Sequence, residues 1–412
     1  MTRPLDGLLV VSMEQAVSAP YATRQLADLG ARVIKVERPD GGDFARAFDT
    51  HANGTGAHFA WANRNKESLA VDVKKPGGRR VVGELLARAD VFTHNLVPGA
   101  AARLGLDGAS LRALHPRLVV CEISGYGTGG PYDGRKAYDL LVQAESGLTA
   151  ITGSPEEPVK PGISVADIAA GMFAFSSVLA ALLRRASTGE GCVLEVSMLD
   201  AMADWMGYPL VVRRHGTQPA LAPGMSHPAI APYDAYRAAD GRLVTVSVQN
   251  DREWAKLATT VLGRPELAGD PRYATNQARV AHRDAIDALV AGAIGAMDAD
   301  RAVAALHAAG IGCGLVNDLA AVVEHPQLVA RDRWLTVDAP AGPVAAPLPP
   351  PVTAAWQPPA GAVPGLGEHT EAVLRELGYE APAIAKLRDE GAVRMSEDVR
   401  TSEDVRTSEE RP

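Results

Sequence analysis

The sequence contains few cysteines and few aromatic residues. Cysteine occurs only three times in 412 residues, and phenylalanine, tryptophan and tyrosine together make up 5% of the chain. The cysteines, Cys121, Cys192 and Cys313, lie far apart, without a CxxC or His/Cys spacing. This pattern excludes a disulfide scaffold and does not support a zinc site. We therefore expect a reducing, cytoplasmic environment.

The chain also lacks an excess of positive charge. Lys and Arg total 41 against 49 for Asp and Glu, which gives a formal net charge of -8. This balance excludes a broad electrostatic footprint for nucleic acid, although a local basic groove remains possible. Apolar residues at 47% and charged residues at 22% are typical of a globular protein. At about 150 residues per domain, the length predicts two or three domains.

One apolar run needs to be considered as a membrane span. The uncharged run Ile168–Leu183 falls short of the ~20 residues that a bilayer requires and is rich in Ala, Gly and Ser. We predict a helix that is apolar all round and buried in a soluble protein. The opening residues, MTRPLDGLLVVSMEQ, predict a first strand rather than a signal peptide.

Short β-branched runs alternate with helical stretches over the first 200 residues. Strands are predicted at 7–11, 32–37, 68–73, 90–94, 118–123 and 192–197, with helices at 19–29, 77–88 and near 111. Such alternation predicts an α/β fold with a parallel, doubly wound sheet. Ligands of these sheets bind beyond the carboxyl ends of the strands. The loops RPDGGD, HNLVPG and SGYGTGGPYDGRKAYD are therefore candidates for the site.

Changes in composition divide the chain further. We predict a large domain at 1–200, a crossing linker at 201–232 and a small domain at 233–330. A Pro-rich return linker follows at 331–367, too rich in proline for a helix. Residues 368–392 should pack back on the large domain. Residues 393–412, which repeat SEDVRT, should form a disordered tail.

Two features of the sequence are candidates for catalysis or ligand binding. Asp167 lies where the extended segment GISVA meets the apolar helix, a predicted N-cap position. It is either a structural cap, the commoner case, or an ionised carboxylate aimed for use as a nucleophile or base. The glycine-rich loop 125–139 is either a surface loop or a ligand lid. It is not a GxxxxGK[ST] loop, and no GxGxxG follows the first strand, so no dinucleotide cofactor is indicated.

Basic residues at the predicted strand ends form a third feature. On a doubly wound sheet they would ring the ligand crevice, where ammonium and guanidinium groups suit phosphates. Singly, each is more typical of a solvated surface charge. The four residues are Arg38, Lys74, Arg103 and Lys136.

Several stretches together resemble one family. These are SAPYATRQLADLGARVIKVERPDGGD, NRNKESLAVDVKKPGGRR, ADVFTHNLVPGAAARLGLD, ISGYGTGGPYDGRKAYDLLVQAESGL, SVADIAAGMFAFSSVLAAL, STGEGCVLEVSMLDAM, YDAYRAADGRLVTVSVQNDREW and LGEHTEAVL. The chain resembles the class III CoA-transferases of the CaiB/BaiF type, which include the α-methylacyl-CoA racemases. The resemblance implies a Rossmann-like large domain built from both chain ends, with a smaller α+β domain inserted. It also implies a homodimer of interlinked rings. The expected partners are acyl-CoA and carboxylic acid substrates, without a permanently bound cofactor, metal, nucleic acid or membrane.

The resemblance also implies roles for particular residues. Asp167, in SVADIAAG, falls on the catalytic aspartate, which would carry CoA as an aspartyl-CoA thioester, and Asp139 falls on a supporting carboxylate. The positions that match CoA-contacting residues are Val17, Ala19, Arg38, Val71, Lys74, Asn95, Leu96, Arg103, Lys136 and Tyr138. Lys136 and Arg103 are the expected phosphate partners.

Two departures from the family pattern favour a transferase over a 2-methylacyl-CoA racemase. Racemases of this family carry a His at the position of Tyr138 and a Glu at that of Gln249. Proton exchange at an α-carbon needs two bases that work near neutral pH, and a tyrosine with a pKa of about 10 is a poor one. The region APGMSHPAIAP lacks the glycine run of the formyl-CoA branch, whereas YDLLVQAESGL resembles enzymes for short dicarboxylic or branched acids, with succinyl-CoA as donor. A non-catalytic acyl-CoA-binding protein is the remaining alternative, and the intact Asp167 disfavours it.

Overall fold

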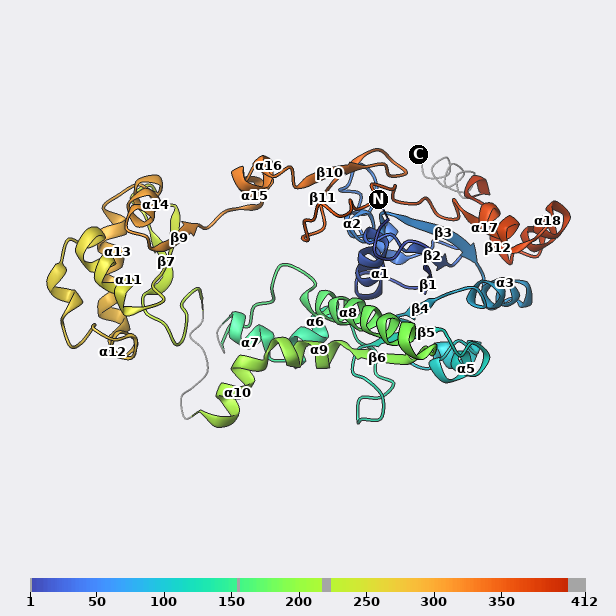
Figure 1. Cartoon of the computed structure of the whole chain (residues 1–412), viewed down its shortest axis with the longest axis horizontal. Coiled ribbons are helices and arrows are strands. Elements are labelled where there is room, and N and C mark those ends of the chain that lie inside the picture. The colour runs from blue at the N-terminus through green and yellow to red at the C-terminus, as the bar shows by residue number, and fades with distance from the viewer. Residues whose placement is uncertain (1, 154–155, 217–223, 399–412) are drawn as a thin grey trace, which may run out of the picture. The chain divides into compact units, whose positions relative to one another are not determined.

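The chain divides into two compact units in the computed structural model, which describes residues 2–153, 156–216 and 224–398 (Figure 1). Unit 1 comprises Met1–Ser146, Pro161–Gly207 and Arg333–Pro412, whereas unit 2 comprises Gly147–Lys160 and Tyr208–Asp332. Unit 1 thus takes residues from both ends of the chain.

A seven-stranded sheet in the order β12-β3-β2-β1-β4-β5-β6 organises unit 1. The strands from β3 to β6 run parallel, which confirms the predicted parallel sheet. They are β1 (Leu9–Met13), β2 (Arg32–Glu37), β3 (Lys66–Val71), β4 (Val91–His94), β5 (Val119–Ser124) and β6 (Val193–Ser197). The strand order reverses between β1 and β4. In doubly wound sheets the ligand crevice opens at this point, beyond the carboxyl ends of the two strands.

Helices cover both faces of this sheet. On one side, α1 (Ser18–Asp28) packs against α8 (Val165–Thr188), and α8 also contacts β5 and β6. The main apolar core contains side chains of the sheet and of α3 (Pro76–Leu86), α5 (Gly108–Leu114), α17 (Thr370–Leu377) and α18 (Ala381–Asp389). The remaining helices of unit 1 are the 3-10 turn η1 (Phe44–Ala47), α2 (Ala57–Asn63), α4 (Ala100–Leu104), α6 (Asp139–Glu145) and α9 (Met198–Trp205).

The C-terminal segment returns to unit 1. Within the predicted linker, β10 (Trp334–Val337) and β11 (Val344–Pro347) form an antiparallel ribbon. Farther on, α17 packs on β3 and α3, and β12 (Val393–Arg394) pairs antiparallel with β3 (Figure 1). The prediction of a disordered tail from residue 393 is therefore wrong for its first residues, because β12 completes the sheet edge and Met395 is buried. Residues 399–412 lie outside the described part of the chain.

Unit 2 has its own small sheet and core. Strands β7 (Tyr233–Arg237), β8 (Leu243–Ser247) and β9 (Gly312–Leu315) pair antiparallel, which confirms the predicted hairpin at its start. An apolar core around Trp254 joins the sheet to the helices. These are α11 (Asp251–Lys256), the π-helical turn η2 (Leu257–Val261), the 3-10 turn η3 (Pro265–Ala268), α12 (Asn276–Ala281), α13 (Arg283–Gly295) and α14 (Ala299–Ala308). The short helices α7 (Leu148–Thr152), α15 (Leu319–Val323) and α16 (Pro326–Ala330) also belong to this unit.

The predicted crossing linker at 201–232 is largely helical at its start. It contains the end of α9 and all of α10 (Gly207–His215), so this segment is not extended throughout. The apolar sequence MLDAMADW explains α9, whose Met198, Ala201 and Met202 are buried. Residues 217–223 lie outside the described part of the chain.

The apolar helix α8 packs in the helical layer beside the sheet. By length and composition it is the one helix of the described residues that could cross a bilayer, a test that core helices of soluble proteins also pass. Arg185 near its end is buried and pairs with Asp90 at 2.8 Å. However, the helix is not buried all round as predicted, because Leu183 is 76% exposed. One side of α8 thus packs in unit 1 and part of its apolar surface remains uncovered.

Candidate active site

The predicted site residues of unit 1 gather along one edge of the sheet. Each comes at or after the carboxyl end of a parallel strand, where the ligand crevice of such a sheet lies. Val17 and Ala19 follow β1, Arg38 follows β2, Val71 and Lys74 end and follow β3, Asn95, Leu96 and Arg103 follow β4, and Lys136, Tyr138 and Asp139 follow β5.

The loop after β1 is held in place by two side chains. Asn95 accepts the Gln15 N–H at 2.9 Å and donates to the Gln15 carbonyl at 2.8 Å. The buried Asp43 accepts the Ala16 N–H at 3.0 Å. Ala16 has a φ of 59°, a left-handed conformation that costs a non-glycine residue roughly 1–2 kcal/mol. The clamp at Asp43 and Asn95 holds this bend and so fixes the start of α1 at Ser18.

Asp167 is not the N-cap of α8, contrary to the prediction. The helix starts at Val165, which places Asp167 inside its first turn. The cap comes from α6 instead: one oxygen of Asp139 accepts the backbone N–H groups of Ala166 at 2.9 Å and Asp167 at 3.3 Å. The sequence could not show this, because a carboxylate from another helix satisfies the orphan donors of α8. The Asp167 side chain is thereby free for other contacts.

The carboxylate of Asp167 contacts the first residue of α1. The hydroxyl and the backbone N–H of Ser18 lower the pKa of this carboxyl. Gly171, one turn along α8, allows this approach, because a Cβ there would lie 2.6 Å from the Ser18 carbonyl oxygen. Burial, and secondly the charge of Asp139, raise the pKa of Asp167 to about 7, and the Ser18 bonds oppose this rise. Burial thus opposes the ionised form of this carboxylate, which was one of the two alternatives from the sequence.

The glycine-rich loop leads into Asp139. A Cβ on Gly125 would lie 2.0 Å from that of Ala137, so only glycine lets the two ends of the loop meet. Within the loop, the guanidinium of Arg135 lies 3.7 Å from the ring centre of Tyr132. The loop therefore has its own internal contacts and returns the chain directly to Asp139 at the start of α6.

The predicted phosphate partners lie at the rim of this edge. Lys74, Arg103 and Lys136 are exposed, and Arg38 donates to the Gly42 carbonyl at 3.0 Å. Tyr138 is 64% exposed. These side chains thus remain a set of separate surface groups along the crevice edge. In contrast, Asn95 is hydrogen-bonded to Ser18, and Asp139 to the backbone of Asp167. Gln249, named for its bearing on racemase chemistry, lies in unit 2.

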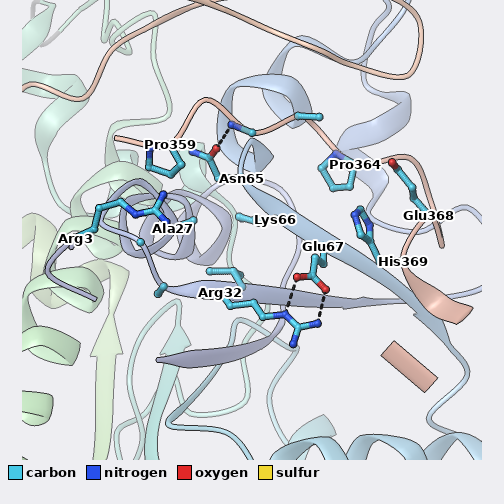
Figure 2. A pocket seen from close by; sticks show the side chains of 15 residues that line it. Arg3, Ala27, Arg32, Asn65, Lys66, Glu67, Pro359, Pro364, Glu368 and His369 are labelled. Atoms are coloured by element: carbon cyan, nitrogen blue, oxygen red, sulfur yellow. Dashed lines mark hydrogen bonds and ion pairs between the residues drawn. The ribbon is translucent and has the colours of Figure 1, made fainter. Parts of the chain in front are cut away.

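A cavity of about 390 Å³ lies at the opposite end of the sheet (Figure 2). Residues at the starts of β2 and β3, among them Arg32 and Glu67, line it together with Pro359 and His369 of the return segment. Arg32 is already paired with Glu67 at 2.7 Å (Figure 2). None of the predicted site residues lines this cavity. No cluster of three or more His, Cys, Asp or Glu residues suited to a metal occurs within the described part of the chain.

Two contributors to the site were missed by sequence reasoning. Ser18 lies between the named Val17 and Ala19, and its place directly after the loop that follows β1 was the available signal. Gln143, fully buried in α6, donates to Asp139 at 2.6 Å and fixes its carboxylate. Its spacing of four residues from Asp139 in the run DLLVQAE was the available signal, because residues four apart are neighbours on one helix.

The match to known proteins agrees with this arrangement. Residues 5–370 match the model of CoA-transferase family III, so the chain belongs to that family. It is accordingly a CoA-transferase, an enzyme that moves coenzyme A between an acyl-CoA and a free carboxylic acid.

Curated relatives extend over nearly the whole chain. The chain is 34% identical to a succinyl-CoA:glutarate CoA-transferase of Mus musculus, over 96% of this chain and 91% of the relative. It is 35% identical to a succinate--glutarate CoA-transferase of Agrobacterium fabrum, over 91% and 96%. An acetyl-CoA:oxalate CoA-transferase of Acetobacter aceti is 36% identical over 81% and 85%.

Solved structures show the same fold. A CaiB/BaiF family protein from Brucella suis superposes with a TM-score of 0.79 at 35% identity, covering 92% of this chain and all of that one. A hypothetical protein from Mycobacterium tuberculosis gives a TM-score of 0.80 at 31% identity, over 90% and 99%. The mixed α/β fold with its mainly parallel sheet is thus the fold of this family.

Proposed function

We propose that this enzyme transfers CoA from a dicarboxylic acyl-CoA, with succinyl-CoA as donor, to a second short dicarboxylic acid through Asp167. The observation that carries the proposal is the placement of the Asp167 carboxylate. It lies beside the loop after β1, next to the point where the strand order reverses, and titrates near pH 7. A carboxylate whose pKa lies near the pH of the reaction is ionised in a substantial fraction of the molecules. It is also more basic than an ordinary carboxylate, which suits nucleophilic attack.

In the proposed reaction, covalent intermediates on the enzyme conserve the free energy of the thioester bond. An oxygen of Asp167 attacks the donor thioester carbonyl; a C–O bond forms, the C–S bond breaks and CoA leaves as a thiolate. The thiolate then attacks the aspartyl carbonyl of this anhydride. A new C–S bond forms, and the donor acid leaves as a carboxylate. The acceptor carboxylate repeats both steps in reverse order on the aspartyl-CoA thioester, so no ATP is consumed.

The choice of a dicarboxylate rests on the relatives and on the sequence. Two of the similar proteins are named for succinyl or succinate and glutarate. A third is named for acetyl-CoA and oxalate, but APGMSHPAIAP lacks a run of glycines for closing over so small an acid. We place the enzyme in the cytoplasm, where its three free thiols would stay reduced.

Mass spectrometry of CoA esters tests the proposal. The protein is incubated in D2O with succinyl-CoA and related acyl-CoAs, each with and without glutarate, mesaconate or itaconate. We expect new CoA esters only when an acid is added, with glutarate among the accepted acids. Deuterium entering the α-carbon of a 2-methylacyl-CoA without any acceptor would instead establish a racemase. CoA binding without either reaction would leave only an acyl-CoA-binding protein.

We further propose that the enzyme is a homodimer whose two chains interlink as rings. Large apolar side chains on α6 and α8 support a partner surface, because monomeric proteins rarely leave such groups uncovered together. Leu140, Leu141 and Leu183 are 50%, 46% and 76% exposed, and Ile163, just before α8, is 60% exposed. Unit 2 is also inserted between segments of unit 1, so each chain leaves one unit and returns to it.

Interlinked rings differ from an ordinary dimer in how they dissociate. We expect light scattering to give twice the chain mass at every dilution, down to nanomolar protein. Under urea, loss of the dimer should coincide with loss of the circular dichroism signal, because folded rings cannot separate. A folded monomer that appears on dilution would contradict the interlinked arrangement.

A further inference from the structure

Gln143 bridges two chain segments that meet at the start of α8. Its side chain is fully buried, and its Nε2 group donates to Oδ2 of Asp139 at 2.6 Å and to the carbonyl of Ile163 at 3.3 Å. These contacts fix the orientation of the amide, because the reversed amide would place its oxygen against two acceptors. Gln143 thus ties the first residue of α6 to the backbone that leads into α8.

The two oxygens of Asp139 have different partners. Oδ2 accepts from Gln143, whereas Oδ1 accepts the backbone N–H groups of Ala166 at 2.9 Å and Asp167 at 3.3 Å. The bond from Gln143 therefore sets the rotation of the carboxylate and directs Oδ1 at the first turn of α8. A continuous set of hydrogen bonds runs from the Gln143 amide through the Asp139 carboxylate to the backbone of Asp167.

The same bonds determine which of the two aspartates carries the negative charge. N–H donors favour the ionised form of a carboxylate, and Asp139 accepts three of them. From the elements packed against α8, two residues act on the Asp167 carboxyl: Asp139 of α6, whose charge raises its pKa, and Ser18 of α1, whose donors lower it. When two carboxyl groups lie close together, the one with more donors ionises first, and the other holds the proton.

We propose that Gln143 is a positioning residue for the nucleophile, acting through Asp139 to hold the first turn of α8 in place and to keep the negative charge on Asp139. The inference deepens the proposed function and rests on it, because it assumes that Asp167 attacks the thioester. A nucleophile must meet the reacting carbon in one geometry, and a displacement of about 1 Å can cost roughly 100-fold in rate. A fully buried amide is a rigid means of fixing that geometry.

The variant Gln143→Met tests the role of the amide, because it keeps an unbranched side chain but removes the donor. We expect kcat to fall about 10- to 100-fold, while KM for the acyl-CoA stays within about 3-fold. Without its donor on Oδ2, Asp139 takes up a proton more readily, and its charge then raises the pKa of Asp167 less. The midpoint of the kcat/KM profile should therefore move to lower pH.

A double variant shows whether Gln143 acts through Asp139. In the background of Asp139→Asn, residue 139 has no charge for Gln143 to maintain. Adding Gln143→Met there should move the pH midpoint no further, although each single change moves it. A residue that acted independently of Asp139 would instead add its full shift to the double variant.

Another amide beside α8 provides the matched control. Gln25 of α1 donates to the sulfur of Met172 in α8 at 3.3 Å and has no hydrogen bond to Asp139 among the described residues. Gln25→Met makes the same chemical change and should leave both kcat and the pH midpoint as in the wild type. If Gln143→Met does not fold, Gln143→Asn replaces it, because an amide shortened by one methylene group no longer reaches Asp139 yet fills most of the space.

The wild type in the same assay separates this inference from the proposed function. If the wild type transfers CoA but the Gln143 variants keep its kcat and pH midpoint, the role of Gln143 alone is overturned. A loss of kcat without a shift of the midpoint would overturn it too, because packing would then explain the loss, and so would additive shifts in the double variant. Absence of transfer by the wild type with every acid would overturn the proposed function instead.

Discussion

Replacing Asp167 with alanine is expected to abolish CoA transfer, with a loss in kcat of at least about 10⁴-fold, while the protein remains folded and binds acyl-CoA. The reason is covalent: no neighbouring group can substitute for an atom that forms and breaks bonds in every step. Chromatography of the CoA esters measures the loss. Hydroxylamine added during turnover should convert an aspartyl-CoA thioester into a hydroxamate at residue 167, which peptide mass spectrometry detects. Transfer retained by Asp167→Ala would refute the mechanism.

The pH profile supplies a second readout of the same residue. Because the pKa of Asp167 is raised to about 7, kcat/KM for the donor should rise with pH through about 7 as the carboxylate ionises. The variant Asp139→Asn removes a negative charge that raises this pKa, so its profile should move to lower pH. The oxygen of the new amide can still accept the N–H groups at the start of α8. Its NH2 group can donate to Gln143, whose buried and unpartnered Oε1 can turn toward it. An unchanged midpoint in Asp139→Asn would contradict the electrostatic role of Asp139.

Stability should follow the opposite trend with pH. The pKa of Asp167 is higher in the folded protein than its usual 3.8, so the folded state binds the proton more tightly. This contribution is fully present below about pH 4 and is lost as pH rises to about 7. At pH 8 we expect Asp167→Asn to be more stable than the wild type by about 2–4 kcal/mol, at 1.36 kcal/mol per pKa unit with some solvent screening. Thermal melts at pH 5 and pH 8 measure the difference, which should shrink at the lower pH.

The second large effect is expected at Glu14, in a buried charge network beneath the loop after β1. The carboxylate is fully buried and accepts from Lys66 at 2.7 Å, Lys35 at 3.4 Å and the Thr23 hydroxyl at 2.7 Å. Burial lowers the pKa of Lys66 to about 7 even with Glu14 beside it. Glu14→Gln would take away the carboxylate partner of the buried Lys66, whereas Lys35 would keep Asp43. We expect the free energy of unfolding to fall by about 3–5 kcal/mol, measured by urea denaturation.

An exposed ion pair provides the matched control. Glu376, which is 52% exposed, pairs with Arg32 at 2.7 Å, and Glu376→Gln makes the same chemical change at the surface. It should cost less than about 1 kcal/mol, because solvent screens exposed pairs and Arg32 keeps Glu67. Equal costs at the two positions would show that burial does not strengthen the role of Glu14. The network also matters to the site, since Lys35 donates to Asp43 at 2.7 Å and Asp43 holds the Ala16 bend.

The secondary structure of unit 1 was predictable because its signals are local. Runs such as RVIKVE and LVVSM are β-branched and bounded by glycine or helical stretches, and they form β2 and β1 close to the expected bounds. Their alternation with helices also predicted a parallel sheet with its candidate site at the carboxyl ends of the strands. The resemblance of the motifs then directed attention to Asp167 and Asp139. Their electrostatic interaction is a property of the folded chain.

By itself, the sequence determined the order of helices and strands, the class of sheet and the edge at which the site lies, because periodicity and turn residues act over short stretches. Only the tertiary structure decided how Asp167 behaves. Asp139 caps α8 from another helix, Ser18 meets Asp167 where Gly171 lets two helices approach, and burial raises the pKa of the carboxylate. These contacts join residues distant in sequence, and desolvation depends on everything packed around a group. No local pattern encodes either of them.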